Sequence, residues 1–224
     1  ERSVKTERYF VFGMPAATID KRIKELKDHD NIEELGVHFH RKSQNLAEWN
    51  LTYEVGEMLS EETLADIDVL NIGGGLPSVY TNTNEDVINN IYRKIEELKD
   101  WLHGKDIRLM MEPGRHIAAP AGKLHTTIKL VHEHTIIVDA SVYNTDMDAL
   151  IVPVKLLIEG ELTKEEGEPY IIKGKTPCNM DLFRYRAYLH QPQRGDELVF
   201  LNAGAYNFST DFCDLEKPET KVVE

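Results

Sequence analysis

The chain is poor in cysteine and in basic residues, and each shortage removes a class of protein. Its two cysteines, Cys178 and Cys213, form no CxxC pair in 224 residues. This composition predicts neither a disulfide framework nor a zinc site. The 26 basic residues are outnumbered by 39 acidic ones, which gives a formal net charge of −13. Since a negative charge of this size repels nucleic acid and anionic lipid, we expect neither as a partner.

Long apolar runs are also missing. No apolar segment of the sequence reaches the roughly 20 residues that a membrane-spanning helix needs. Residues 1–5 lack the apolar core of a secretory signal. We therefore expect a cytoplasmic protein that makes no membrane contact. Hydrophobic residues make up 41% of the chain, which is enough to build a buried core.

The first half of the sequence alternates between helical and strand patterns. Apolar residues recur at helical spacing in 84–103, and Asn84 precedes them as a possible N-cap. The whole alternation is a helix at 16–29, a strand at 35–40, a helix at 46–59, a strand at 69–72, a helix at 84–103 and a strand at 107–111. Alternation of this kind indicates βα units around a parallel sheet.

After about residue 122 the pattern changes to β-branched and alternating stretches. Turns are expected at Gly160, Gly167 and Gly195. The stretches between them that read as strands are 124–141, 149–160, 169–175 and 197–206. We therefore predict two domains, an α/β domain over 1–122 and an antiparallel β-domain over 123–224.

Two loops that follow predicted strands carry candidate functional residues. Gly73, Gly74 and Gly75 come directly after a strand, where backbone N–H groups can approach a phosphate, although an ordinary turn explains such a triplet equally well. Glu112 and Arg115 follow the next strand in an EPGR segment. They read either as a charged turn or as a pair in which Glu112 keeps a heterocyclic nitrogen protonated and Arg115 grips a phosphate.

Two histidines alternate at the end of the strand predicted at 35–40. His38 and His40 point to the same side of such a strand and could bind a metal or cover a ring. A zinc ion needs a third ligand, which the sequence does not single out. We therefore expect no metal.

Taken together and in order, these segments resemble the pyridoxal-phosphate-dependent decarboxylases of fold type III, which include ornithine, lysine, arginine and diaminopimelate decarboxylases. The resemblance runs from near residue 10 to the C-terminus. It is carried by GVHFHRKSQ (36–44), LNIGGGLP (70–77), EPGRHIAAPAG (112–122), PCNMD (177–181), RGDELVFLNAGAYNFS (194–209) and FCDLEKPETKVVE (212–224). It implies the C-terminal half of a TIM-like (β/α)8 barrel followed by an antiparallel β-barrel or sandwich.

The resemblance also implies pyridoxal 5′-phosphate as the cofactor and assigns residues to it. His40 is expected to stack on the pyridine ring, and Glu112 to pair with the ring nitrogen. The remaining contacts are to the phosphate, and they are expected from Ser43, Gly73, Gly74, Gly75, Arg115 and Tyr206. His40 and Glu112 are therefore candidate catalytic residues as well as cofactor ligands.

A cysteine completes the set that the resemblance implies. Cys178 matches a family cysteine that reaches the active site from the partner subunit and returns a proton to the substrate, so a homodimer is expected. The next residue is Asn179, where ornithine and diaminopimelate decarboxylases carry an acid that contacts the far end of the substrate. An amide lacks the charge that a distal ammonium group favours, so the amino-acid substrate could instead have a polar or carboxylated distal end. Polyamine and lysine biosynthesis both stay open.

The lysine that carries the cofactor in this family lies near the start of the barrel, in a segment without a counterpart here. Lys42 lies close to the histidine motif, but the family has no cofactor lysine at that position. We therefore expect the N-terminal part of the barrel, with this lysine, to come from other polypeptide. Two alternatives to a decarboxylase are a non-catalytic homologue that acts as a binding or regulatory protein, and an amino-acid racemase.

Overall fold

The computed structural model describes residues 13–47, 49–208 and 212–223. Predictions that involve residues 1–5, Glu48, Ser209, Glu224 or the side chain of Cys213 lie outside this description. By its internal contacts the chain divides into two compact units. Unit 1 comprises the residues up to Pro77 together with Asn84–Gly114, and unit 2 comprises Ser78–Thr83 together with the residues from Arg115 onwards. The domain boundary predicted at 122 stays a prediction.

Unit 1 is built on short parallel strands. Among the described residues, β1 (Gly36–His38), β2 (Val69–Asn71) and β3 (Arg108–Met110) form one sheet in that order, with both pairs parallel. This confirms the parallel sheet predicted from the alternation. His38 is aligned with Asn71 and Asn71 with Met110, so the strands end level with one another.

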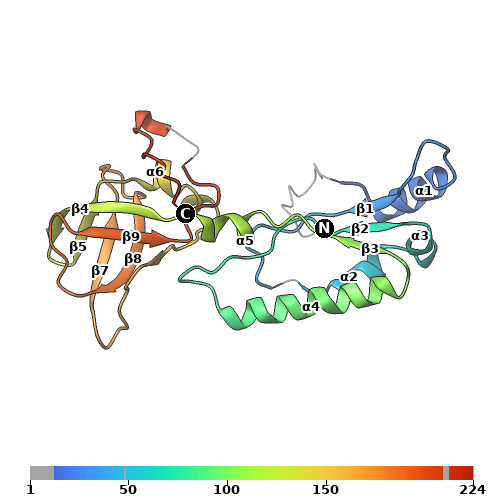
Figure 1. Cartoon of the computed structure of the whole chain (residues 1–224), viewed down its shortest axis with the longest axis horizontal. Coiled ribbons are helices and arrows are strands. Elements are labelled where there is room, and N and C mark those ends of the chain that lie inside the picture. Colours follow the sequence, from blue (N-terminus) through green and yellow to red (C-terminus); the bar gives the residue numbers. More distant parts are fainter. Residues whose placement is uncertain (1–12, 48, 209–211, 224) are drawn as a thin grey trace. The chain divides into compact units, whose positions relative to one another are not determined.

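The helices of unit 1 are α1 (Ala16–Leu26), α2 (Leu51–Met58), α3 (Glu61–Ala65) and α4 (Glu85–His103). Helix α4 runs along the sheet (Figure 1), and Leu98 and Leu102 on its apolar face are fully buried in the core of unit 1. The predicted N-cap is confirmed, since the side chain of Asn84 accepts a hydrogen bond from the backbone N–H of Asp86.

The helix predicted at 46–59 is wrong at its start, because α2 begins at Leu51. The preceding residues form a turn held by Asn45, whose side-chain oxygen accepts the backbone N–H of Ala47. The indole N–H of Trp49 donates to the backbone oxygen of Asn45. Local side-chain to backbone bonds of this kind compete with helical ones and delay the start of the helix.

Unit 2 is built on one larger sheet. Among the described residues its strands are ordered β6-β9-β4-β5-β7-β8. The bounds are β4 (Leu124–His132), β5 (Thr135–Val138), β6 (Leu157–Ile158), β7 (Glu168–Lys173), β8 (Leu182–Leu189) and β9 (Glu197–Leu201). The prediction of a purely antiparallel domain is wrong, because β5 and β7 pair in parallel. The crossover that joins β5 to β7 spans residues 139–167 and includes the edge strand β6, and a parallel pair requires a connection of such length.

The helical segments of unit 2 are α5 (Arg115–Ala118), η1 (Ala119–Ala121), α6 (Val142–Thr145), α7 (Asp148–Ile151) and η2 (Phe212–Asp214). Of these, α6 and α7 lie in the crossover between β5 and β7. The strand predicted over 149–160 is therefore reduced to β6, and Pro153, which has no N–H for a ladder, separates it from α7. In the parts of the chain that the structure describes, no helix is long and apolar enough to cross a membrane.

The short segment Ser78–Thr83 follows the glycine triplet in sequence but belongs to unit 2. Tyr80 is buried in the core of that unit. The backbone N–H of Thr81 donates to the backbone oxygen of Lys155 at 2.8 Å, and the Asn202 amide donates to the oxygen of Val79 at 2.8 Å. This stretch is therefore fixed to unit 2 by both packing and hydrogen bonds.

Candidate active site

The level strand ends of unit 1 bring three predicted site residues side by side. His40, Gly73 and Glu112 each lie two residues beyond the aligned positions that end β1, β2 and β3. The backbone N–H of Glu112 donates to the backbone oxygen of Gly73 at 2.8 Å, so the alignment continues past the strands. In (β/α) barrels the functional groups lie at the carboxyl ends of the parallel strands.

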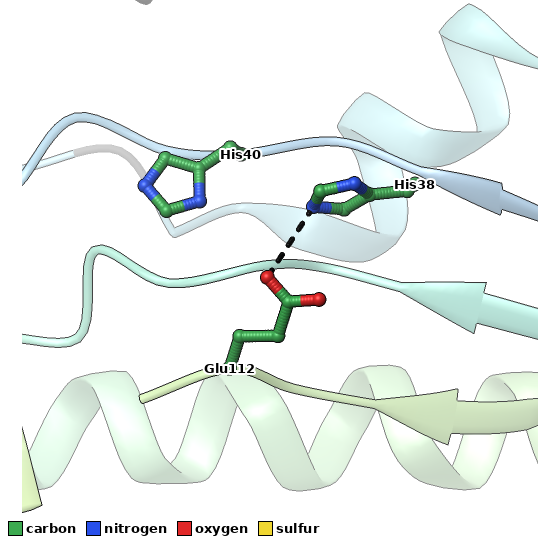
Figure 2. Close-up of side chains that lie close together, drawn as sticks. All are labelled: His38, His40 and Glu112. Atoms are coloured by element: carbon green, nitrogen blue, oxygen red, sulfur yellow. Dashed lines mark ion pairs between the residues drawn. The ribbon is translucent and has the colours of Figure 1, made fainter. Parts of the chain in front are cut away.

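The carboxylate of Glu112 is contacted from the other two strands of the sheet. Asn71 donates from Nδ2 to Oε1 of Glu112 at 2.8 Å. On the other side, Nε2 of His38 lies 3.7 Å from Oε2 of Glu112, and both side chains are 52% exposed (Figure 2). The carboxylate is therefore oriented by its neighbours while it remains open to a ligand that carries an N–H group.

The glycine loop leaves no room for side chains. A Cβ atom on Gly74 would lie 2.9 Å from both the Glu112 backbone oxygen and Cε1 of His40. Gly73 and Gly75 have φ angles of +61° and +95°, a conformation that favours glycine. The N–H of Gly73 donates to Asn71 and that of Gly74 to Nδ1 of His40, so an anion at the loop must compete with these two acceptors.

Ser43 lies in the turn that follows the histidine motif. The chain around it packs on the glycine loop, since the backbone N–H of Asn45 donates to the Gly75 oxygen at 3.1 Å. A Cβ on Gly75 would meet Arg41 and the backbone oxygen of Lys42 at 2.8 Å. Ser43 is therefore held in the same region of unit 1 as Gly75.

The structure supplies the third donor that the sequence did not single out for a metal. One ligand atom each from His38, His40 and Glu112 lie within 4.8 Å of one another. However, Nδ1 of His40 accepts the N–H of Gly74, and in that neutral tautomer Nε2 carries the proton. A metal would have to displace this bond, and the absence of a metal stays a prediction.

Arg115 and Tyr206 meet within unit 2. Arg115 is 3% exposed, and its guanidinium forms a two-pronged pair with the buried carboxylate of Asp148 and donates to the Tyr80 hydroxyl at 3.1 Å. The exposed ring of Tyr206 lies 4.9 Å from the guanidinium carbon. Burial opposes the charge, but the interactions with Asp148 and Tyr80 together outweigh it and raise the pKa of Arg115. A phosphate would have to compete with Asp148 for this side chain.

Cys178 and Asn179 lie in the exposed loop between β7 and β8. The Tyr143 hydroxyl donates to Sγ of Cys178 at 2.8 Å. This hydrogen bond is the largest influence on the thiol, and it lowers the pKa of Cys178. Asn179 is exposed in the turn that follows.

Sequence reasoning missed the partners that hold these residues. Asn71 was visible as the polar residue that ends the strand before the glycine triplet, but nothing in the local pattern linked it to Glu112. Asp148 and Tyr143 gave no signal, because their partners lie 33 and 35 residues away. The predicted residues thus form a glycine, histidine and glutamate group in unit 1, and separate arginine and cysteine groups in unit 2.

Comparison with known proteins identifies the family of the chain. The family described as pyridoxal-dependent decarboxylase, pyridoxal binding domain, matches residues 5–119, just over half of the sequence. The chain therefore belongs to the pyridoxal-dependent decarboxylase family. It is 28% identical over 221 residues to a diaminopimelate decarboxylase of Aquifex aeolicus, covering 92% of this chain and 52% of that protein. A diaminopimelate decarboxylase of Campylobacter jejuni is 27% identical, with 88% and 51% covered.

Solved structures show the same fold. A lysine/ornithine decarboxylase of Vibrio vulnificus, complexed with cadaverine, matches with a TM-score of 0.71 and 22% identity, over 92% of this chain and 59% of that one. A Helicobacter pylori diaminopimelate decarboxylase, complexed with L-lysine, matches with a TM-score of 0.69 and 24% identity, over 91% and 53%. The chain spans about half the length of the curated relatives it matches.

Proposed function

We propose that this chain is the cofactor-binding and proton-donating part of a pyridoxal-phosphate-dependent amino-acid decarboxylase. The observation that carries the proposal is the convergence of His40, the glycine loop and Glu112 at the level ends of three parallel strands. The loop forms a cradle that a single Cβ would fill, and the carboxylate beside it is oriented but exposed. A flat ring with a basic nitrogen and an attached phosphate fits both features.

In this proposal each residue of unit 1 has a distinct task. His40 covers one face of the cofactor ring, and Glu112 accepts the hydrogen bond of the protonated ring nitrogen. When bound, the cofactor supplies an electron-accepting ring for the electron pair that stays behind as carbon dioxide leaves. Asn71 donates to the oxygen of Glu112 that does not face His38, so the carboxylate keeps one orientation.

The phosphate contacts are proposed from Ser43, Gly73, Gly74, Gly75, Arg115 and Tyr206. Gly73 and Gly75, with positive φ angles, let the backbone approach an anion closely. Arg115 belongs to this set by resemblance, and its pairing with Asp148 means that binding would redistribute its hydrogen bonds.

The wider architecture is part of the same proposal. The parallel sheet and its helices would form the C-terminal half of a TIM-like (β/α)8 barrel, and the sheet of unit 2 the family's C-terminal β-domain. The rest of the barrel, with the lysine that carries the cofactor, would come from polypeptide outside these 224 residues. Cys178 would enter the active site of a second copy in a homodimer, where it returns a proton to the substrate.

The substrate class follows from the residue after Cys178 and from the relatives. The named relatives act on diaminopimelate, lysine or ornithine, amino acids with a polar distal end. Asn179 supplies an amide in the exposed loop, which can donate and accept hydrogen bonds but carries no charge. We infer an amino acid whose distal end is polar or carboxylated.

Borohydride reduction of the full-length protein, followed by peptide mapping, tests the cofactor assignment. We expect a pyridoxyl label on a lysine outside the 224 residues, together with release of carbon dioxide from an amino acid. Glu112→Gln should lower that release about ten- to a hundredfold, the rate equivalent of one charge-assisted hydrogen bond. Glu159→Gln, in an exposed pair with Lys123, serves as the control. A protein that takes up no label and releases no carbon dioxide would instead be a non-catalytic homologue.

A further inference from the structure

A tyrosine that the motif comparison does not include lies against the candidate proton donor. Tyr143 belongs to α6, and its hydroxyl donates to Sγ of Cys178 at 2.8 Å. The two residues are 35 positions apart in sequence, so the contact is made by the fold. Cys178 itself is exposed, which leaves its other side open to a ligand.

The contact is fixed by a buried carboxylate. Asp181 is fully buried, and its side chain accepts the backbone N–H of Val142 at 2.9 Å. It also accepts from Thr176, through the backbone N–H at 3.0 Å and the hydroxyl at 2.7 Å. A Cβ on Gly174 would clash with this carboxylate, so the chain passes closely over it. One buried acid therefore ties the start of α6 to the loop that carries Cys178.

We propose that Tyr143 is a positioning residue for Cys178, holding the thiol in one direction and stabilising the sulfur after its proton has left. The inference deepens the proposed function, because it rests on Cys178 acting as the proton donor. Nothing in the resemblance assigns this role to Tyr143.

The chemistry of the step explains why such a donor is useful. As Cys178 delivers its proton, the S–H bond breaks and a C–H bond forms at the carbon that carbon dioxide has left. The sulfur keeps the electron pair as a thiolate, and a proton from solvent later restores it. A thiolate accepts a stronger hydrogen bond than a thiol does, so the Tyr143 hydroxyl favours the state after transfer.

The lowered pKa of the thiol agrees with this geometry. The Tyr143 hydroxyl is its first cause, and the backbone of Met180 and Asp181 adds to the effect. Hydrogen bonds to the charged form lower the pKa of an acid in this way.

The test measures alkylation of Cys178 by iodoacetamide as a function of pH, in the chain with Cys213→Ser so that one thiol reacts. Tyr143→Phe keeps the ring and removes the donor. In this variant we expect the midpoint of the alkylation profile to move to higher pH. The alkylation rate at about pH 7 should fall about threefold or more, because the sulfur loses one hydrogen bond. Tyr185→Phe, an exposed tyrosine on β8, should leave the profile unchanged.

The sign of the effect separates positioning from simple shielding. If Tyr143 only covered the sulfur, its replacement would raise the alkylation rate, and that result, like an unmoved profile, would overturn the inference. Phe212→Leu alters a ring that lies 5.6 Å from that of Tyr143 but keeps the hydroxyl, so its profile should match the parent if the hydroxyl is what matters. Circular dichroism of each variant checks the fold.

Failure of the Tyr143 inference can be distinguished from failure of the proposed function. A shifted profile in a protein without decarboxylase activity would support the Tyr143 contact and refute the function. An unshifted profile in an active decarboxylase would refute the inference alone. In an active full-length enzyme, Tyr143→Phe should in addition lower turnover while Tyr185→Phe does not.

Discussion

Two groups of polar side chains, one in each unit, are held in different ways. In unit 1, the side chains of Glu112 and His38 are half exposed, and Oε2 of Glu112 lies 3.7 Å from Nε2 of His38. The register of the parallel strands brings the two residues together. In unit 2, Arg115, Asp148 and Asp181 are buried and bonded on several sides. The comparison teaches that the exposed carboxylate of Glu112 is available to a ligand, whereas the buried carboxylates of Asp148 and Asp181 hold the chain around them in place.

The difference follows from what each unit has to organise. Parallel strands that end level bring the residues that follow them together, so the polar groups there can contact one another without being buried. The loops of unit 2 have no such register, and buried acids take its place. An unpaired buried charge is costly, so each of these acids must be matched by donors.

The largest expected effect comes from breaking the buried pair of unit 2. Asp148→Ala leaves the guanidinium of Arg115 buried without its carboxylate and should lower the free energy of unfolding by about 3–5 kcal/mol. Glu159→Ala breaks the exposed pair with Lys123 and should change the free energy of unfolding far less, because solvent screens an exposed ion pair. Urea unfolding of both variants measures the difference, and equal losses would refute the contrast drawn above.

A smaller effect is expected from filling the cradle of unit 1. Gly74→Ala places a methyl group 2.9 Å from the Glu112 backbone oxygen and the His40 ring, and should cost about 1–3 kcal/mol in stability. It should also weaken binding of pyridoxal phosphate, which titration of the full-length protein measures. Gly56→Ala in α2 meets nothing within 4 Å and should stabilise the chain by about 0.5–1 kcal/mol. The prediction fails if both alanines behave alike.

The smallest expected effect concerns Asp146, a buried acid of unit 2 that can be compared with Asp148 and Asp181. Asp146 is fully buried, and among the described residues neither of its carboxylate oxygens has a hydrogen-bond partner. Burial, with the nearby charge of Asp148, raises the pKa of Asp146 well above its ordinary value. The folded state therefore holds a proton that the unfolded state releases, so this group favours folding at low pH and loses that contribution as pH rises through the raised pKa.

Asp146→Asn removes that ionisation. The variant should be more stable than the parent at about pH 8, and this difference should shrink as the pH falls towards about 4. Thermal unfolding across this range measures it. A difference that did not change with pH would show that Asp146 is charged in the folded protein.

The sequence predicted the part of the site that depends on neighbouring positions. A strand followed by three glycines, or by Glu112, is a local pattern, and the parallel pairing that aligns such strand ends follows from the alternation of helices and strands. The bonds of Arg115 to Asp148 and of Tyr143 to Cys178 join residues more than 30 positions apart, and no local pattern encodes them. Strand β8 was missed because its buried Arg184, paired with Glu161, breaks the apolar alternation.

The segment Ser78–Thr83 has a practical consequence for dissecting the protein. Because unit 1 is interrupted by a stretch that belongs to unit 2, no single cut in the gene yields both units whole. A fragment ending at Gly114 would carry Tyr80 without the core that buries it. The complementary fragment would lack Thr81, whose backbone N–H donates to the backbone oxygen of Lys155. Limited proteolysis at Gly114 should accordingly leave two pieces that stay associated until they are denatured.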